Sequence, residues 1–420
     1  MGPRKPGHLG AGSQGAEAPT ARRMLASVVA VMTSTSLPVF LVGSLEVEMR
    51  SSLSMDVARF GVALAIYYLV ASVTSVPGSR LSERIGGDRS LRTAAALSAL
   101  ALLSIAGAVN DWSELVPALM VAGFAASLAQ PSANLLLAES SPKTRQGIAF
   151  GVKQSAAPLA TLLGGVAVPL IALSVGWRWA FASAAAVATV SAIALPRLPG
   201  GPHLTRAAAR EAGQGMSVVP LLVLSCGFFF GLLAASSLTG FVVASGVAAA
   251  HLSRGGAGIA AAVGGGVGVS VRLLVGWRAD HSMRRFFLVV AGMLGLGALG
   301  YAGLGVGAHD ASPVLYAVAA AAAFGLGWGW NGLFNFAVVR SYPMAPAWAT
   351  GITQTGGRLG AMAGPLAFAF IVKGDSYAWA WSFAGVAALL GAVAVLMGRL
   401  LIVREAAGVR VAPAAGELGL

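Results

Sequence analysis

Three cationic side chains lie inside long apolar stretches, at Lys153, Arg272 and Arg358. At about 1.5 Å of helix per residue, Lys153 and Arg272 lie about 9 Å from the nearer polar end, and Arg358 lies near the middle of its stretch. A cation at such depth needs a watery cavity or a counter-charge. The nearest acids lie only at the ends of the apolar stretches, at Glu46, Glu48, Glu139 and Asp280. Unpaired positive charge favours an anion, and the arginine fork can bind two oxygens of a carboxylate or oxyanion.

Each cation also has a structural explanation. Lys153 is shallow and flexible enough to reach the membrane surface with its ammonium group. Arg272 can reach the inner surface in the same way and pair with a loop acid such as Asp280. The sequence leaves both roles open for Arg272. Arg358 reaches neither surface easily, so its position is the hardest to explain by structure alone.

Buried amides accompany these cations. Two pairs, Gln130/Asn134 and Asn331/Asn335, have i, i+4 spacing, so each pair lies on one helix face. They lie about 6 to 13 Å from the inner ends of their helices. Amides can bind a small polar ligand, or they can hold helices together by interhelical hydrogen bonds. The balance between these roles is nearly even, with a slight preference for the second. Gln154 and Gln354 are further candidates for the ligand site.

Composition indicates which elements hold these residues. Of 420 residues, 57% are hydrophobic and only 10% are charged, whereas soluble domains carry about 25% charged residues. The net charge of +13 is spread thinly between apolar runs, which argues against nucleic-acid binding. A single cysteine, Cys226, excludes an internal disulfide. The sequence therefore predicts an all-α integral membrane protein.

The apolar runs predict twelve transmembrane helices of about 20 residues each. In the first half they cover residues 25–45, 57–78, 93–110, 114–138, 147–172 and 177–196; in the second half they cover 217–244, 256–278, 286–307, 312–339, 347–372 and 377–401. The predicted division is a tail at 1–23, a six-helix half at 24–196, a connector at 197–216, a six-helix half at 217–403 and a tail at 404–420. The first helix has no clear cleavage site after it, so we expect it to be retained.

The distribution of Lys and Arg predicts the orientation. With the N-terminus in the cytoplasm, the inner segments carry 20 of these residues and the outer segments carry 5. Such a bias marks the cytoplasmic side of a membrane protein. We therefore expect both tails and the connector to be cytoplasmic, in a plasma membrane.

The two halves repeat each other at a shift of 200 or 201 residues. Gln130 and Asn134 correspond to Asn331 and Asn335, and Gln154 corresponds to Gln354. A ladder of small residues, Ala156, Ala160 and Gly164, corresponds to Gly356, Gly360 and Gly364. Small residues at this spacing allow close helix packing. Since each half has an even number of spans, the repeat predicts two parallel, pseudo-symmetric six-helix halves, as in one class of transporters.

Two loops carry a family resemblance. The segment from Gly276 through Ala279 and Asp280 to Arg285, between spans 8 and 9, resembles the Gly-x-x-Ala-Asp-Arg-x-Gly-Arg-Arg loop of the major facilitator superfamily. The loop between spans 2 and 3 keeps Glu83, Arg84 and Gly86 but has Ser79 at the usual first glycine. The resemblance implies a secondary transporter of a small solute that works by alternating access. Segments such as Gly151–Pro158 are similar to bacterial cyanate-permease-type porters, and the Arg-x-x-x-Gly spacing at Arg272 is similar to a substrate-binding arginine of monocarboxylate porters.

The same loops are candidates for gating. An acid at the inner end of a helix can pair with nearby arginines or with the positive N-terminal end of a neighbouring helix. We therefore expect conformational latches at Glu83, Arg84, Asp280, Arg284 and Arg285.

Other function classes fit less well. The histidines all lie in tails or loops, at His8, His203, His251, His281 and His309, and no hydrolase or zinc-protease motif occurs. No phosphate-binding loop indicates ATP as a direct energy source. We expect no enzyme activity, no cofactor and no metal. The expected partners are an anionic small-molecule substrate, membrane lipid and a coupling proton, with no nucleic acid and a monomeric state. An exporter of a drug or secondary metabolite is the alternative, and the direction of transport stays open.

Overall fold

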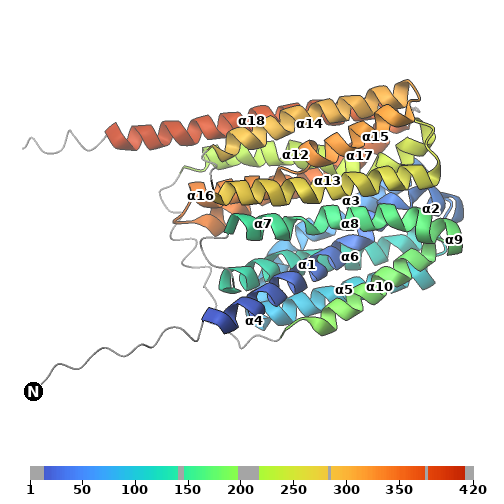
Figure 1. Ribbon diagram of the computed structural model, residues 1–420, viewed down its shortest axis with the longest axis horizontal. Helices are drawn as coiled ribbons and strands as arrows, with labels where there is room; N and C mark the ends of the chain where they lie inside the picture. The colour runs from blue at the N-terminus through green and yellow to red at the C-terminus, as the bar shows by residue number, and fades with distance from the viewer. Residues whose placement is uncertain (1–13, 141–145, 197–216, 282–284, 374–376, 412–420) are drawn as a thin grey trace, which may run out of the picture.

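The computed structural model describes residues 14–140, 146–196, 217–281, 285–373 and 377–411. All regular elements in these ranges are helical, and they run side by side along one axis (Figure 1). The predicted connector 197–216 and Arg284 lie outside the described residues. So do residues 1–13 and 412–420 of the predicted tails.

The first half contains the six predicted spans. Their helices are α1 (Gln14–Ser44), a short α2 (Glu46–Ser52), α3 (Val57–Val73), α4 (Ser75–Ile85), α5 (Gly87–Gly107), α6 (Trp112–Ser140), α7 (Gln146–Gln154), α8 (Ala156–Ala167), the π-helical turn η2 (Val168–Ala172), α9 (Leu173–Val175) and α10 (Trp177–Ala194). The second span is α3 with α4, because backbone hydrogen bonds from Thr74 to Val70 and from Gly78 to Thr74 continue the helix between them. The fifth span comprises α7 to α9.

The second half has the same plan. Its helices are α12 (Val219–Ala248), α13 (Arg254–His281), α14 (Phe286–His309), α15 (Pro313–Ala322), the π-helical turn η3 (Ala323–Gly327), α16 (Asn331–Ser341), α17 (Pro346–Val372) and α18 (Tyr377–Val411). The tenth span comprises α15 to α16. Both α1 and α18 extend further than predicted, by helical turns at residues 14–23 and 404–411 that were expected to be tail. These turns contain Ala, Arg and Glu, which favour helix without needing membrane burial.

Within the described residues, ten helical stretches are long and apolar enough to cross a membrane. An eleventh counts if α2 and α3, whose axes differ by 114°, form one bent span. We instead treat α2 as an outer connecting helix, because seven residues with three charges can neither span a bilayer nor continue α3 at that angle. The remaining predicted span is α10, whose first turn, Trp177 to Trp179 with Arg178, lowers its apolarity. The all-α membrane fold predicted from composition is confirmed.

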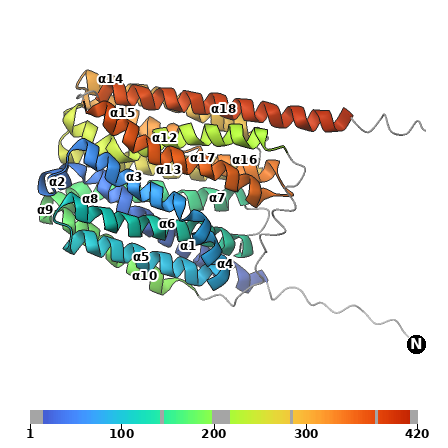
Figure 2. The same cartoon turned by 180° about the vertical axis from the view of Figure 1, so that it is seen from behind.

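Helix ends divide between two faces of the molecule. The beginning of α1 and the end of α18 lie at one end, with α4 and α16, whereas α2, α9 and α15 lie at the opposite end (Figures 1 and 2). Under the predicted orientation, the first is the inner end and the second is the outer end. Seen from behind, α3 of the first half lies beside α17 of the second (Figure 2).

The small-residue ladders pack helices within each half. At Gly164, an added Cβ would lie 2.7 Å from the Ser44 hydroxyl of α1. On α17, Gly356 and Gly360 meet the main chain of α12 at Ser225 and Phe229. Spans 5 and 1 therefore pack in the first half as spans 11 and 7 pack in the second. The close approach follows the repeat read from the sequence.

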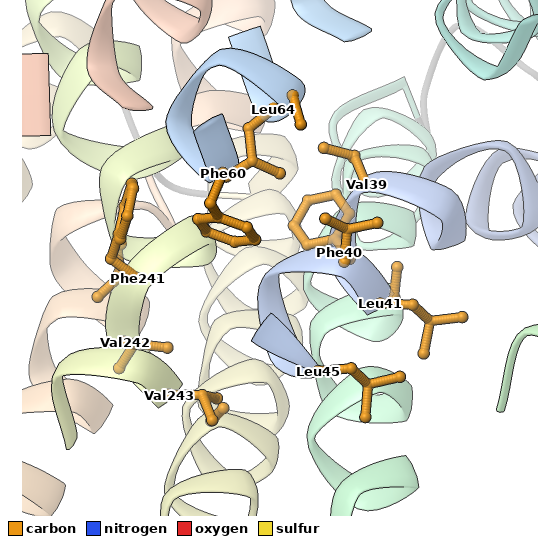
Figure 3. Packing of buried hydrophobic residues seen from close by; sticks show 14 of the residues in the cluster. Val39, Phe40, Leu41, Leu45, Phe60, Leu64, Phe241, Val242 and Val243 are labelled. Carbon is orange, nitrogen blue, oxygen red and sulfur yellow. The ribbon is translucent and has the colours of Figure 1, made fainter. Parts of the chain in front are cut away.

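Glycines also bring the two halves together at the outer end. An added Cβ at Gly43 of α1 would lie 2.6 Å from the Thr239 carbonyl of α12, and one at Gly61 of α3 would lie 2.9 Å from the Pro365 carbonyl of α17. Aromatic rings pack beside these glycine contacts. Phe60 packs edge-on against Phe241 at 5.3 Å, and Figure 3 shows side chains of α1, α3 and α12 gathered there. The outer end is closed where these helices meet.

Candidate functional site

Arg272 lies on α13 with only 3% of its surface exposed, between α7 and the break before α16. Its guanidinium stacks over Trp328, with Cζ 4.5 Å from the ring centroid. Its Nη1 donates to the Gln154 carbonyl and its Nη2 donates to the Trp328 carbonyl at 2.8 Å. The Nε of Arg272 has no hydrogen-bond partner within the described residues.

The chain breaks explain why two carbonyls are free to accept from Arg272. Pro158 has no N–H, so the carbonyl of Gln154, four residues earlier, lacks its helical donor. Trp328 lies between η3 and α16. The Phe334 N–H of α16 donates to the Trp330 carbonyl, so the Trp328 carbonyl lies before the bonds of this helix. Arg272 therefore joins a break in each half. Both of its terminal nitrogens are engaged by main chain, and the adjoining cavity of about 10 Å³ holds at most one water.

Lys153 lies at the end of α7 and is 4% exposed. It does not reach the surface: its Nζ donates to Asn134 Oδ1 of α6 at 2.5 Å. Asn134 itself is exposed. An amide oxygen is a neutral partner, so this bond leaves the positive charge of Lys153 uncompensated.

Arg358 lies on α17 and is half-buried. It lies close enough to Lys153 for the two cations to repel each other. Among the described residues, no comparable interaction with another charge is found for Arg272. Within the described residues, Arg358 makes no ion pair with any acid, since Arg50–Glu46 is the one such pair found there. The three predicted cations thus divide into a neighbouring pair, Lys153 and Arg358, and a separate Arg272.

The amides bond to one another, both between helices and within α16. Gln154 Nε2 donates to Asn331 Oδ1 at 2.8 Å, which joins α7 of the first half to α16 of the second. Asn335 Nδ2 donates to Asn331 Oδ1 at 3.1 Å, and Gln354 Nε2 donates to Asn335 Oδ1 at 2.7 Å. Gln130 has no hydrogen bond among the described residues. The structural role that the sequence slightly favoured accounts for these bonds.

The repeat is visible in these contacts. Asn134 and Asn335 are equivalent, and each accepts from the following span, one from Lys153 and the other from Gln354. In the repeat, Lys153 corresponds to Thr353, which carries no charge, and Asn335 accepts instead from Gln354, the residue after Thr353. The first half therefore contributes the lysine, and the second contributes Arg358 one turn further along α17.

The two predicted latch regions at the inner end differ in their hydrogen bonds. Asp280 Oδ2, at the end of α13, accepts from the Ile148 N–H at 2.8 Å. Ile148 is in the first turn of α7, where N–H groups have no partner within the helix. Glu83 and Arg84 make no ion pair within the described residues, and Arg285 is exposed. Within the described residues, the end of α13 is bonded to the other half through Asp280, and Glu83 and Arg84 make no equivalent bond.

Two equivalent glycines at the inner end, Gly151 and Gly351, differ in how closely they pack against the other half. An added Cβ at Gly151 of α7 would lie 2.8 Å from the Arg272 carbonyl of α13. At Gly351 of α17 no atom lies within 4 Å, and this glycine is exposed. Helices α13 and α16 of the second half pack against α7 of the first half. Their equivalents in the first half, α4 and α6, pack within their own half. The inner end is therefore closed beside α7 and unpacked beside α17.

Sequence reasoning missed Trp328 and Phe40. Their rings stack at 5.8 Å, so α1 reaches the tryptophan that covers Arg272. The signal in the sequence was Gly327 and Gly329 on either side of Trp328, a stretch in which a regular helix is weak.

The family model of the Major Facilitator Superfamily matches residues 24–348. This match begins in α1 and ends at the start of α17, so it covers the first half and the second half as far as α16. The chain belongs to this superfamily. It is therefore a multi-pass membrane protein and a secondary transporter of a small molecule, in a family of transporters and not of enzymes. No curated protein matches the chain.

Proposed function

We propose that this major facilitator superfamily protein transports a small organic or inorganic anion, bound between Lys153 and Arg358. One observation carries the proposal. Two cations from equivalent helices of the two halves lie close enough to repel each other, and Lys153 donates its hydrogen bond to a neutral amide. A bound anion would remove the repulsion between them and supply the missing counter-charge.

The position also suits alternating access. The two cations lie on α7 and α17, on either side of the interface between the halves. A substrate bound to both would be reached from either side as the halves move. The amides Asn134, Gln354 and Asn335 lie beside the two cations and would complete a hydrogen-bonding shell, with Gln130 and Asn331 further along the same helix faces.

In this proposal Arg272 positions the site and does not bind the anion by its fork. Both terminal nitrogens already donate to main-chain carbonyls, so bidentate binding would first have to break those bonds. Its charge still adds to the positive potential, and its bond to Gln154 fixes the residue next to Lys153. This differs from the substrate-binding role that the resemblance to monocarboxylate porters implied.

The remaining features of the proposal follow the sequence. They are a plasma-membrane location with both termini cytoplasmic, a monomer, coupling to a proton as symporter or antiporter, and a substrate of the cyanate or monocarboxylate kind. Export of a drug or secondary metabolite is the competing function. A cationic drug would need an acid beside the site, and the described residues place none beside Lys153 and Arg358.

A substrate screen tests the proposal. The purified protein is reconstituted into liposomes, and uptake of small carboxylates and inorganic anions is compared with uptake of organic cations of similar size. We expect saturable anion transport that Lys153→Gln reduces strongly. Preferred transport of a cation would overturn the proposal.

A further inference from the structure

A second polar group is buried far from Lys153, at the outer end of the molecule. Helix α2 follows α1 after a turn at Leu45 and crosses the outer end between α1 and α3 (Figure 1). It packs against α12 of the other half. Glu46, its first residue, is only 1% exposed.

One of the two carboxyl oxygens of Glu46 has a hydrogen-bond partner among the described residues. Its Oε1 accepts from Arg50 Nη1 at 3.1 Å. Its Oε2 is buried and has no hydrogen-bond partner within the described residues. Leaving an ionised carboxylate buried with one oxygen unpaired is costly. A proton on Oε2 would remove that cost, because Oε1 of the neutral acid still accepts from Arg50.

A cavity adjoins this carboxyl group. It has a volume of about 330 Å³, with Glu46, Arg50 and Ser51 on the α2 side and Ala244, Val247 and Ala248 on the α12 side. This volume is large enough for several waters, which could deliver a proton. Because its walls belong to different halves, the cavity must change shape whenever the halves separate at the outer end.

The charges around Glu46 are few. On α2 itself they are Arg50 and Glu48, and the oxygens of Glu48 are also buried with no hydrogen-bond partner among the described residues. Arg254, at the start of α13, interacts with Glu48. Helix α1 from Met24 to Ser44 and helix α12 contain no charged residue. Beyond the turn, Asp56 caps α3 by accepting from the Arg59 N–H, and Arg59 Nη1 donates to the Ser54 carbonyl.

We propose that Glu46 is the proton-binding site of the transporter, and that it takes up a proton on Oε2 when the outer end closes over α2. When the halves separate, the carboxyl group meets water and the proton leaves to the outside. The inference gives a site to the coupling proton of the proposed function, and it does not depend on the charge of the substrate.

The pH dependence follows from the burial of Glu46. Burial raises the pKa of its carboxyl from 4.5 to about 7 in this closed form, and the opposing effect of Arg50 is smaller. Closure therefore binds a proton. Below about pH 4.5 the acid is protonated in both forms and closure is most favourable. Between about 4.5 and 7 the closed-to-open ratio falls by up to tenfold per pH unit, and above 7 it levels off.

Distance measurements between spin labels test the proposal on the full chain. Labels are attached at Val175→Cys and Val314→Cys, two exposed outer-end positions in different halves, with Cys226 replaced by Ser. We expect a pH-dependent shift between short and long distances in the parent protein. Glu46→Gln should abolish this shift and hold the short distance at every pH. Glu114→Gln, which alters an exposed outer acid, is the matched control and should leave the shift intact.

Two further measurements complete the test. Arg50→Gln removes the cation that favours the ionised form, so it should move the transition to higher pH even if Glu46→Gln folds poorly. Anion binding by Glu46→Gln, measured by calorimetry, should persist, which separates this inference from the proposed substrate site. An unchanged pH shift in Glu46→Gln, or a parent protein whose distances ignore pH, would overturn the inference.

Discussion

At the scale of the residue, the same chemical type has two uses in this protein. Arg272 and Arg358 are both arginines inside spans, but Arg272 donates to two main-chain carbonyls, whereas Arg358 lies close enough to Lys153 to repel it. The sequence identified both as costly cations. It could not assign their roles, because the partners of Arg272 depend on how α7 and α16 end in space. The absent N–H of Pro158 was the part of that answer readable in advance.

Replacement of Arg272 should therefore act on stability. In Arg272→Gln, at least one of the two carbonyls loses its donor, at a cost of about 1–3 kcal/mol for each buried acceptor left unpaired. We expect a lower unfolding temperature with anion affinity changed only modestly. Arg358→Gln serves as the comparison, since it should lower affinity and leave the unfolding temperature nearly unchanged. The reverse pattern would assign anion binding to Arg272.

At the scale of the element, glycines set how closely the two halves approach. Gly165 of α8 meets α13, and an added Cβ would lie 2.5 Å from the Ala262 nitrogen and 2.5 Å from the Gly258 carbonyl. The main chain must move apart to accept it. The ladders themselves were predicted from the sequence, whereas the contacts between halves were not, since they involve helices distant in the chain.

Gly165→Ala should disfavour the outer-closed form. We expect longer outer-end distances between the same pair of spin labels, and slower transport. Gly292→Ala on α14 is the matched control, because a Cβ there meets nothing within 4 Å and alanine favours helix by up to about 1 kcal/mol. Equal effects of the two substitutions would contradict the packing argument.

The acids Asp280 and Glu83 at the inner helix ends are the candidate latches between elements. Asp280 holds the first turn of α7 through Ile148, as expected of a latch, while Glu83 makes no equivalent bond to a described residue. A charge at a helix N-terminus contributes about 0.3–2 kcal/mol, or about a 2- to 30-fold change in population. Asp280→Asn should slow transport by a factor in this range and leave anion affinity within a few-fold. Initial uptake rates and calorimetry check both, and full transport by the variant would exclude the latch.

At the scale of the whole molecule, two similar halves are joined unequally. The repeat, the spans and the family could be predicted from the sequence, because apolar length and residue spacing determine them. The difference between Gly151, packed on α13, and Gly351, which meets open space, could not. The burial of Glu46 could not be predicted from the sequence either, since it depends on the packing of α12 of the other half against α2. Both features belong to the relative placement of the halves, which is also what alternating access changes.

Calorimetry on purified variants tests most directly whether Lys153 and Arg358 bind an anion between the halves. The anion preferred in the uptake screen is titrated into the parent protein, Lys153→Gln, Arg358→Lys and Arg358→Gln. Loss of one charge-assisted bond costs about 1.5–3 kcal/mol, so Lys153→Gln and Arg358→Gln should each weaken binding by about 10- to 100-fold. Arg358→Lys should bind more weakly than the parent, because the planar fork is lost. Parent-like affinity in all three variants would contradict the account.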